Sequence, residues 1–79
     1  MIVNVYYRDE ETGSVRAGRA YSYRCSIPNA HVGMEVIAPT AKREARAVIC
    51  AINVPESRID ERILPLLKEI TQEVPVDGE

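Results

Sequence analysis

The sequence predicts a mainly β protein, a small antiparallel β-barrel or curled sheet of four to six strands with a short C-terminal helix or a fifth strand. Several segments alternate apolar and polar side chains or are rich in β-branched and aromatic residues, which is typical of strands. Glycine, proline and asparagine separate these segments, as at turns. Because 79 residues allow one thin core, we assign residues 1–72 to a single domain and residues 73–79 to a flexible acidic tail.

The first expected strand covers residues 2–7, which are mostly β-branched or aromatic. The polar turn that follows contains Gly13, which can adopt the positive φ of a tight turn. The second strand begins at Arg19 and is closed by Pro28, because proline cannot donate to a β-ladder. We expect these two strands to be antiparallel neighbours, joined by an extended hairpin arm.

One face of the second strand carries Tyr21, Tyr23 and Cys25, and we expect this face to be turned to the core. A third strand at residues 34–39 and a fourth at residues 45–54 follow after short turns. Three strands joined by two turns make a β-meander, which is the expected centre of the fold.

Residues 57–72 allow two structures. Pro65 would cost about 3 kcal/mol inside a helix, but it is tolerated in the first turn of a helix that starts near Leu64. The alternative is an irregular stretch followed by a fifth strand at residues 66–71. We favour the helix, because the apolar residues have the spacing of one helical face. These residues are Ile59, Ile63, Leu66, Leu67 and Ile70.

The charge of the chain is unevenly distributed. The formal net charge is −2, whereas nucleic-acid-binding domains are usually basic. Residues 12–46, however, carry six cations and two anions, a charge of +4, and residues 51–79 carry three cations and seven anions, a charge of −4. The basic half is suited to an anionic partner, and the alternative is a charged solubilising surface.

The composition points away from membranes, metals and catalysis. No apolar run is long enough to span a bilayer, and the N-terminus lacks the features of a signal peptide, so we expect a cytoplasmic protein. Cys25 and Cys50 are expected to be free thiols. His31 has no cysteine partner at zinc-binding spacing, and no catalytic or phosphate-binding motif is present. We therefore expect no metal, no other cofactor and no enzyme activity.

Tyrosine is the only aromatic residue type in the chain, with four copies. A tyrosine ring can stack on a nucleobase, which is worth about 1–3 kcal/mol per base, and nearby cations hold phosphates in a salt-dependent way. The alternative is that the rings belong to the core and the cations to an ordinary surface. The candidate nucleic-acid-binding residues are Arg19, Tyr21, Ser22, Arg24, Lys42, Arg43 and Arg46.

Four short motifs follow one another in an order that is known from one family. The run Arg-Ala-Tyr-Ser-Tyr at residues 19–23 opens a strand that closes on Pro28. Residues 32–39 combine a glycine with a short strand that ends in proline, residues 47–54 form a β-branched strand, and residues 64–75 are leucine-rich and lead to a proline. In this order the motifs resemble the N-terminal 3′-DNA-binding domain of the primosomal replication-restart helicase PriA (primosomal protein N′), here as a stand-alone small protein.

The resemblance implies a small barrel that holds the 3′ end of a DNA strand in a pocket. It places Tyr21 at the aromatic position of that pocket. Ser22 stands where the family has an acidic residue that contacts the terminal hydroxyl, Thr40 replaces a phenylalanine, and Ala41 replaces a glycine. It also implies that residues 66–71 are extended.

We therefore expect a non-enzymatic module that binds single-stranded or 3′-end DNA, with a replication protein as a further partner. The alternative function is a protein-interaction or accessory module that keeps the fold without binding DNA.

Overall fold

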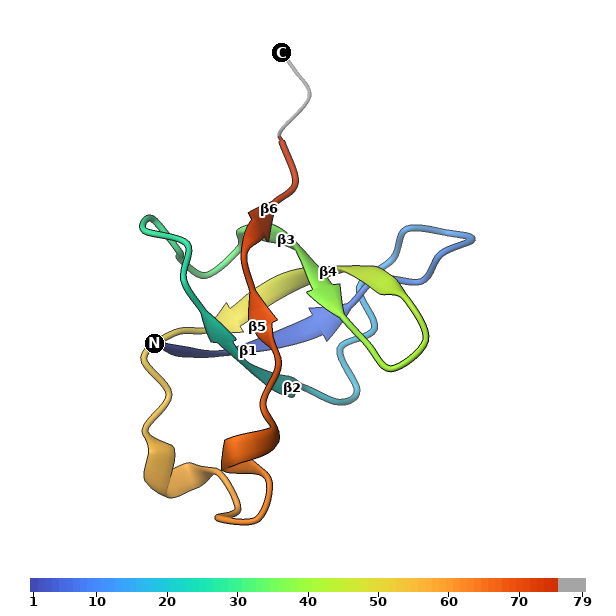
Figure 1. Cartoon of the computed structure of the whole chain (residues 1–79). Coiled ribbons are helices and arrows are strands. Elements are labelled where there is room, and N and C mark those ends of the chain that lie inside the picture. The colour runs from blue at the N-terminus through green and yellow to red at the C-terminus, as the bar shows by residue number, and fades with distance from the viewer. Residues whose placement is uncertain (76–79) are drawn as a thin grey trace.

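A computed structural model describes residues 1–75 and contains, over that range, six β-strands and two short 3₁₀ helices (Figure 1). The strands are β1 (Ile2–Tyr7), β2 (Tyr21–Cys25), β3 (Glu35–Pro39), β4 (Glu44–Ala51), β5 (Glu69–Ile70) and β6 (Gln72–Glu73), and the 3₁₀ helices are η1 (Glu56–Arg58) and η2 (Leu64–Leu66). The six strands form one nearly closed, barrel-like sheet. The mainly β fold class predicted from the sequence is confirmed.

The two ends of the sheet meet in one extended stretch of chain. The strand order is β5-β2-β1-β4-β3-β6, and Thr71 alone separates β5 from β6. β5 pairs with β2 in parallel, and β6 pairs with β3 in antiparallel orientation. The last strands in the chain, drawn in red in Figure 1, therefore join the two edges of the sheet and nearly close the barrel.

The prediction that the second, third and fourth strands form a meander is wrong. β2 does not pair with β3 in the sheet, because β1 and β4 lie between them. β1 is antiparallel to both neighbours, as was expected for β2. Ile2, Val3 and Val5 are almost fully buried, so the most apolar strand takes the centre of the sheet, where both of its edges are paired. The hairpin of β3 and β4 is present as expected.

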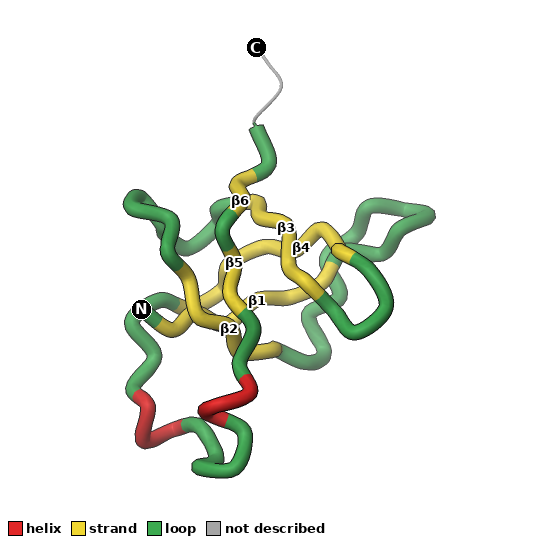
Figure 2. The backbone as a smooth tube through the Cα atoms, in the orientation of Figure 1, coloured by secondary structure: helices red, strands yellow, loops and turns green. Residues whose placement is uncertain are grey.

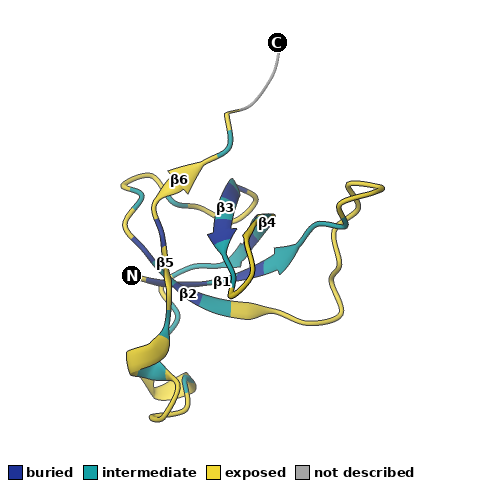
Figure 3. Cartoon of the chain, turned by 45° about the vertical axis from the view of Figure 1, so that its right-hand side comes forward, coloured by how far each residue is buried: buried dark blue, intermediate teal, exposed yellow. Residues whose placement is uncertain are grey.

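The core lies inside the barrel, where side chains from alternate strand positions pack together. Figure 3 shows that the buried stretches of chain lie on the strands. Tyr23 and Cys25 are buried there, as expected, whereas Tyr21 on the same face of β2 is 36% exposed because the barrel ends at that level. Cys25 and Cys50 are both free thiols, which confirms the expectation from the sequence. The buried cluster consists of Val3, Val5, Tyr23, Cys25, Met34, Val36, Ala38, Ala47, Ile49 and Ile70.

The prediction of a helix in residues 57–72 is wrong, and the alternative, an extended chain with a fifth strand, is found (Figure 2). Helical structure in this segment is limited to the end of η1 and to η2, which has Pro65 in its first turn, and a fifth strand follows at Glu69–Ile70. The apolar residues do not share one buried face: Ile63 is 50% exposed and Leu66 is 70% exposed, whereas Ile70 is fully buried. Only an extended chain brings Ile70 into the core and completes the ladder of β2.

The ordered sheet continues past the boundary expected at residue 72. Glu73 belongs to β6, and the N–H of Val74 donates to the carbonyl of Glu35 at 2.9 Å. Residues 76–79, the rest of the expected acidic tail, lie outside the described residues.

Closure of the barrel by Ile70 leads to the first prediction. Ile70→Ala removes a fully buried side chain and should lower the free energy of unfolding by about 2–5 kcal/mol. Leu66→Ala, at a position 70% exposed, is the control and should change it by less than about 0.5 kcal/mol. Urea denaturation of both variants measures the difference; equal losses would show that the closing segment does not support the core.

Candidate nucleic-acid interface

Three tyrosines gather at one open end of the barrel. Tyr7 is the last residue of β1, and Tyr21 and Tyr23 lie on the core face of β2. The ring centroids of Tyr7 and Tyr21 are 4.7 Å apart, with 35° between the ring planes. The guanidinium of Arg19 lies over the Tyr21 ring, 5.3 Å from its centroid, at a distance where a cation is attracted to the ring.

The Tyr23 hydroxyl bridges the open part of the seam between β2 and β3. β5 reaches β2 at Arg24 and Cys25, so its pairing stops short of Tyr23. Beyond that level the Tyr23 hydroxyl donates to the carbonyl of Pro39 at 2.9 Å and is hydrogen-bonded to the Tyr7 hydroxyl. Because Tyr23 gives its only proton to Pro39, Tyr7 is the donor in the second bond.

Burial is the main cause that raises the pKa of Tyr23 above its ordinary value, and the hydrogen bond with Tyr7 adds to it. The phenol therefore stays neutral and keeps its donor at physiological pH.

Three hollows open around this tyrosine cluster, and Tyr7 contributes to the wall of each. The seam hollow, of about 490 Å³, lies between β2 and the residues that follow β3. The central hollow, of about 260 Å³, is lined by Tyr7, Arg16, Gly18, Arg19 and Tyr21. The arm hollow, of about 600 Å³, lies between the hairpin arm of residues 8–16 and the loop of residues 40–43.

The seam hollow brings together the residues that the family resemblance places in one pocket. Tyr21 and Ser22 line it from β2, and Thr40 and Ala41 line it from the loop after β3. Three cations, one carboxylate and several apolar side chains also line this hollow. The charged residues are Arg19, Arg58, Lys68 and Asp60, and the apolar ones include Ile59, Ile63, Leu66 and Leu67.

The Ser22 hydroxyl already forms one hydrogen bond within the sheet. It donates to the side-chain carbonyl of Asn4, the residue opposite it on β1, at 2.7 Å. Its oxygen keeps lone pairs that can accept a further hydrogen bond.

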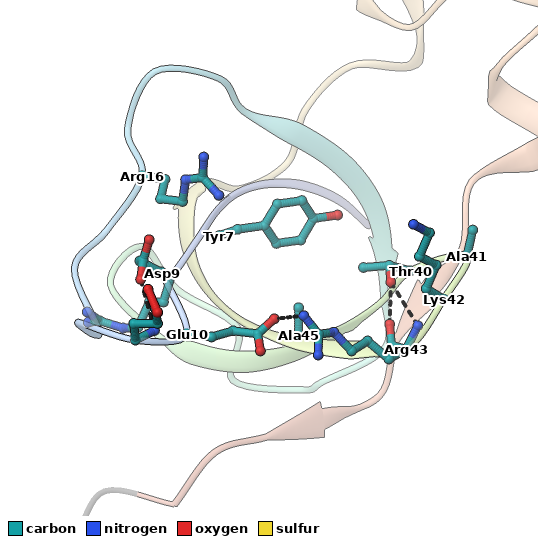
Figure 4. A pocket seen from close by; sticks show the side chains of 11 residues that line it. Tyr7, Asp9, Glu10, Arg16, Thr40, Ala41, Lys42, Arg43 and Ala45 are labelled. Atoms are coloured by element: carbon teal, nitrogen blue, oxygen red, sulfur yellow. Dashed lines mark hydrogen bonds and ion pairs between the residues drawn. The ribbon is translucent and has the colours of Figure 1, made fainter.

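Figure 4 shows the arm hollow from close by, with the Tyr7 ring in the middle, Arg16 on one side and Thr40 and Lys42 on the other. Arg43 forms an ion pair with Glu10 across the hollow. The N–H of Arg43 also donates to the Thr40 hydroxyl at 3.1 Å, which holds the loop in a tight turn.

Arg8 anchors the hairpin arm. Its Nε and one terminal nitrogen of its guanidinium donate to the Glu35 carboxylate, the first at 2.9 Å. The other terminal nitrogen donates to the carbonyl of Gly13 and so fixes the tip of the arm. Gly13 has a φ of 75°, as the sequence suggested. The hydrogen bond from Arg8 is the main cause that lowers the pKa of Glu35. The pair is only about a quarter exposed, so it is less screened than a surface pair.

The structure brings five of the seven sequence-predicted residues to the tyrosine end. Arg19, Tyr21 and Ser22 line the seam hollow, and Lys42 and Arg43 line the arm hollow. The other two lie elsewhere. Arg24 alternates with the inward Tyr23 and Cys25 and sits opposite Glu69 of β5. Arg46 alternates with the buried Ala47 on β4 and lines none of these three hollows. It lines a fourth hollow of about 360 Å³, which adjoins the arm hollow and shares Arg8, Asp9, Glu10, Arg43 and Ala45 with it.

Sequence reasoning missed Tyr7, Arg16, Arg58 and Lys68 as residues of this end. Tyr7 could have been found, because it shares a face with Val3 and Val5 and the register that pairs Val5 with Tyr21 carries it to the same end. Arg58 and Lys68 could not, because they flank a segment whose path depends on the closure of the barrel.

No family model matches the chain, and no significant match is found among the curated proteins or among the solved structures. Within residues 1–75, no helix has the length and apolar character needed to cross a bilayer. The same part of the chain contains no group of three or more His, Cys, Asp or Glu side chains placed to hold a metal ion.

The Tyr23 bridge leads to a second prediction. Tyr23→Phe keeps the ring but leaves the Pro39 carbonyl without its donor, which should cost about 1–3 kcal/mol of unfolding free energy. Tyr21→Phe, on the exposed ring of the same strand, is the matched control and should cost much less. Thermal or urea unfolding compares the two, and equal effects would contradict the structural role of the bridge.

A third prediction concerns pH. Because the folded pKa of Glu35 lies below its ordinary value of 4.5, the ionised carboxylate stabilises the fold above that pH and loses this effect as the pH falls through the folded pKa. Glu35→Gln should therefore destabilise the protein at neutral pH, with the difference from wild type shrinking once the pH falls below the ordinary pKa of 4.5. Urea unfolding at neutral pH and below pH 4.5 measures it. Glu44→Gln, at an exposed glutamate, is the control; a pH-independent loss in Glu35→Gln would count against the ion pair.

Proposed function

We propose that the protein is a non-enzymatic, cytoplasmic module that binds single-stranded DNA and receives the end of the strand in the seam hollow. The observation that carries this proposal is the placement of Tyr21. Its partly exposed ring is flanked by Arg19 and shares one hollow with Ser22, Thr40 and Ala41. The two segments that the resemblance to the PriA domain joins in one pocket are thus neighbours in space.

The seam hollow offers a nucleotide both kinds of contact that single-strand binders use. Tyr21 provides a ring for a base, and Ile63 and Leu66, which line the same hollow, provide apolar surface that is otherwise exposed to water. Arg58 and Lys68 also line this hollow and supply positive charge for a phosphate. The hollow therefore combines stacking, apolar contact and charge within one site.

Recognition of a 3′ end requires a contact to the terminal hydroxyl. Ser22 stands at the position to which the resemblance assigns that contact. Its hydroxyl donates one hydrogen bond to Asn4, and its oxygen can still accept a hydrogen bond from the terminal hydroxyl. A neutral acceptor forms a weaker hydrogen bond than a carboxylate. We therefore expect a preference for a free 3′ hydroxyl over a 3′ phosphate that is modest rather than absolute.

The state of the cysteines supports the cytoplasmic location, and the family resemblance supports a replication protein as the partner. Both cysteines are free thiols, as is usual in a reducing compartment. A protein that holds strand ends would act beside the replication machinery, and a replication protein is the partner that the resemblance implies.

The fourth prediction tests DNA binding. Fluorescence anisotropy with a short labelled oligodeoxythymidylate should show binding that weakens as salt is raised. Tyr21→Ala should weaken binding by about 5- to 150-fold, the loss of one stacked base. Arg19→Ala should weaken it more than Arg24→Ala, which removes the same charge away from the hollows.

Two results would contradict the proposal. The first is an absence of binding at low salt. The second is equal loss in Arg19→Ala and Arg24→Ala, which would indicate attraction by overall charge instead of a site.

The exposure of Ile63 and Leu66, at 50% and 70%, favours a second candidate function, a protein-interaction module. In that case a purified replication protein would bind the chain, and Ile63→Ser with Leu66→Ser would abolish the complex. Wild-type protein would then fail to bind oligonucleotides at low salt, which separates this candidate from the first.

A further inference from the structure

We infer that the arm hollow is a second nucleotide subsite, so that the protein holds two consecutive nucleotides of a single strand; this inference rests on the proposed function. One base would lie on Tyr21 in the seam hollow and the next against Tyr7 in the arm hollow. The phosphate that links them would lie in the central hollow. Tyr7 lines all three hollows, which makes them neighbours along one path across the end of the barrel.

The central hollow is suited to a phosphate. Arg16 and Arg19 line it together with Tyr7, Gly18 and Tyr21, and none of these residues is acidic. Neither arginine forms an ion pair with a carboxylate among the described residues. The central hollow therefore offers two guanidinium groups to a linking phosphate, next to two tyrosines that can each contact a base.

The arm hollow is suited to a base more than to a phosphate. The Tyr7 ring stands at its centre, with Arg16 and Lys42 on opposite sides (Figure 4). Several charged side chains in its wall already form ion pairs: Arg43 pairs with Glu10, and Arg8 pairs with Glu35. The carboxylate of Asp9 accepts the backbone N–H groups of the next turn, which lowers its pKa, and it lies in the field of Arg16.

The charge of the three hollows favours a polyanion over a lone neutral ligand. Among the described residues, seven cationic and four acidic side chains line them, a formal charge of +3. The whole chain has a formal charge of −2. The tyrosine end is thus the positive part of an acidic protein, as a path for a nucleic-acid backbone requires.

The test compares thymidine 5′-monophosphate with oligothymidylates of two, three and four nucleotides by isothermal titration. We expect affinity to rise by about 5- to 150-fold between one and two nucleotides, the value of one further stacked base. Longer strands should add little. Arg16→Ala should remove most of the rise from one to two nucleotides. Arg62→Ala, which removes an exposed arginine outside the three hollows, should leave the rise unchanged.

The possible outcomes separate failure of the second subsite from failure of the proposed function. Binding of the monophosphate with no gain for the dinucleotide would overturn the second subsite and leave the strand-end site standing. A steady gain with every added nucleotide, unaltered in Arg16→Ala, would also overturn it, because it indicates diffuse attraction along the backbone. Failure of all four ligands to bind would overturn the proposed function and the second subsite together.

Discussion

Closure of the sheet by residues 69–73 is the constraint on which the rest of the structure depends. Without this segment the sheet would be the open four-stranded β2-β1-β4-β3, with one edge of β2 and one edge of β3 unpaired. The chain satisfies both edges with one extended stretch, which pairs with β2 through β5 and with β3 through β6. The same stretch places Ile70 in the core. A helix at this position, however well its apolar residues were spaced, could supply neither the ladder nor the buried side chain.

The candidate site exists because this closure is incomplete. β5 and β6 are two residues long, so the seam between β2 and β3 stays open towards the tyrosine end. The Tyr23 hydroxyl spans the opening through the carbonyl of Pro39, and Tyr7 satisfies the Tyr23 oxygen in turn. Beyond this bridge no strand covers Tyr21 within the described residues, and its ring is left at the surface. Tyrosines that look alike in the sequence thus differ in position: the buried Tyr23 bridges the seam, whereas Tyr7 and Tyr21 line the central hollow.

Local patterns predicted the strands but could not predict how they pair. Alternation along residues 2–7 and 21–25 identified β1, β2 and the buried positions of Tyr23 and Cys25, because side-chain period is a local property. The partners of β1 depend on contacts between residues far apart in the chain, and its placement between β2 and β4 was missed. The spacing of the apolar residues in residues 57–72 fitted one face of a helix; they are Ile59, Ile63, Leu66, Leu67 and Ile70. Only Ile70 among them is fully buried. Sequence spacing alone does not show which of these side chains reaches the core. For the candidate site, Tyr21, Ser22, Lys42 and Arg43 were predicted from the chemistry of their side chains, and Thr40 and Ala41 from the family resemblance. Arg58 and Lys68 enter it only through the path that barrel closure imposes on residues 52–68.

The proposed ligand contacts are confined to the tyrosine end of the barrel. An NMR titration of the labelled protein with a short single-stranded oligonucleotide measures where the ligand binds. Under this proposal, shift changes should cluster on the amides of Tyr7, Arg19, Tyr21 and Ser22 and on those of the loop from Thr40 to Arg43. Changes centred on Arg24 or Arg46, on the outer surface of the sheet, would contradict it, and so would changes spread evenly over all the basic residues.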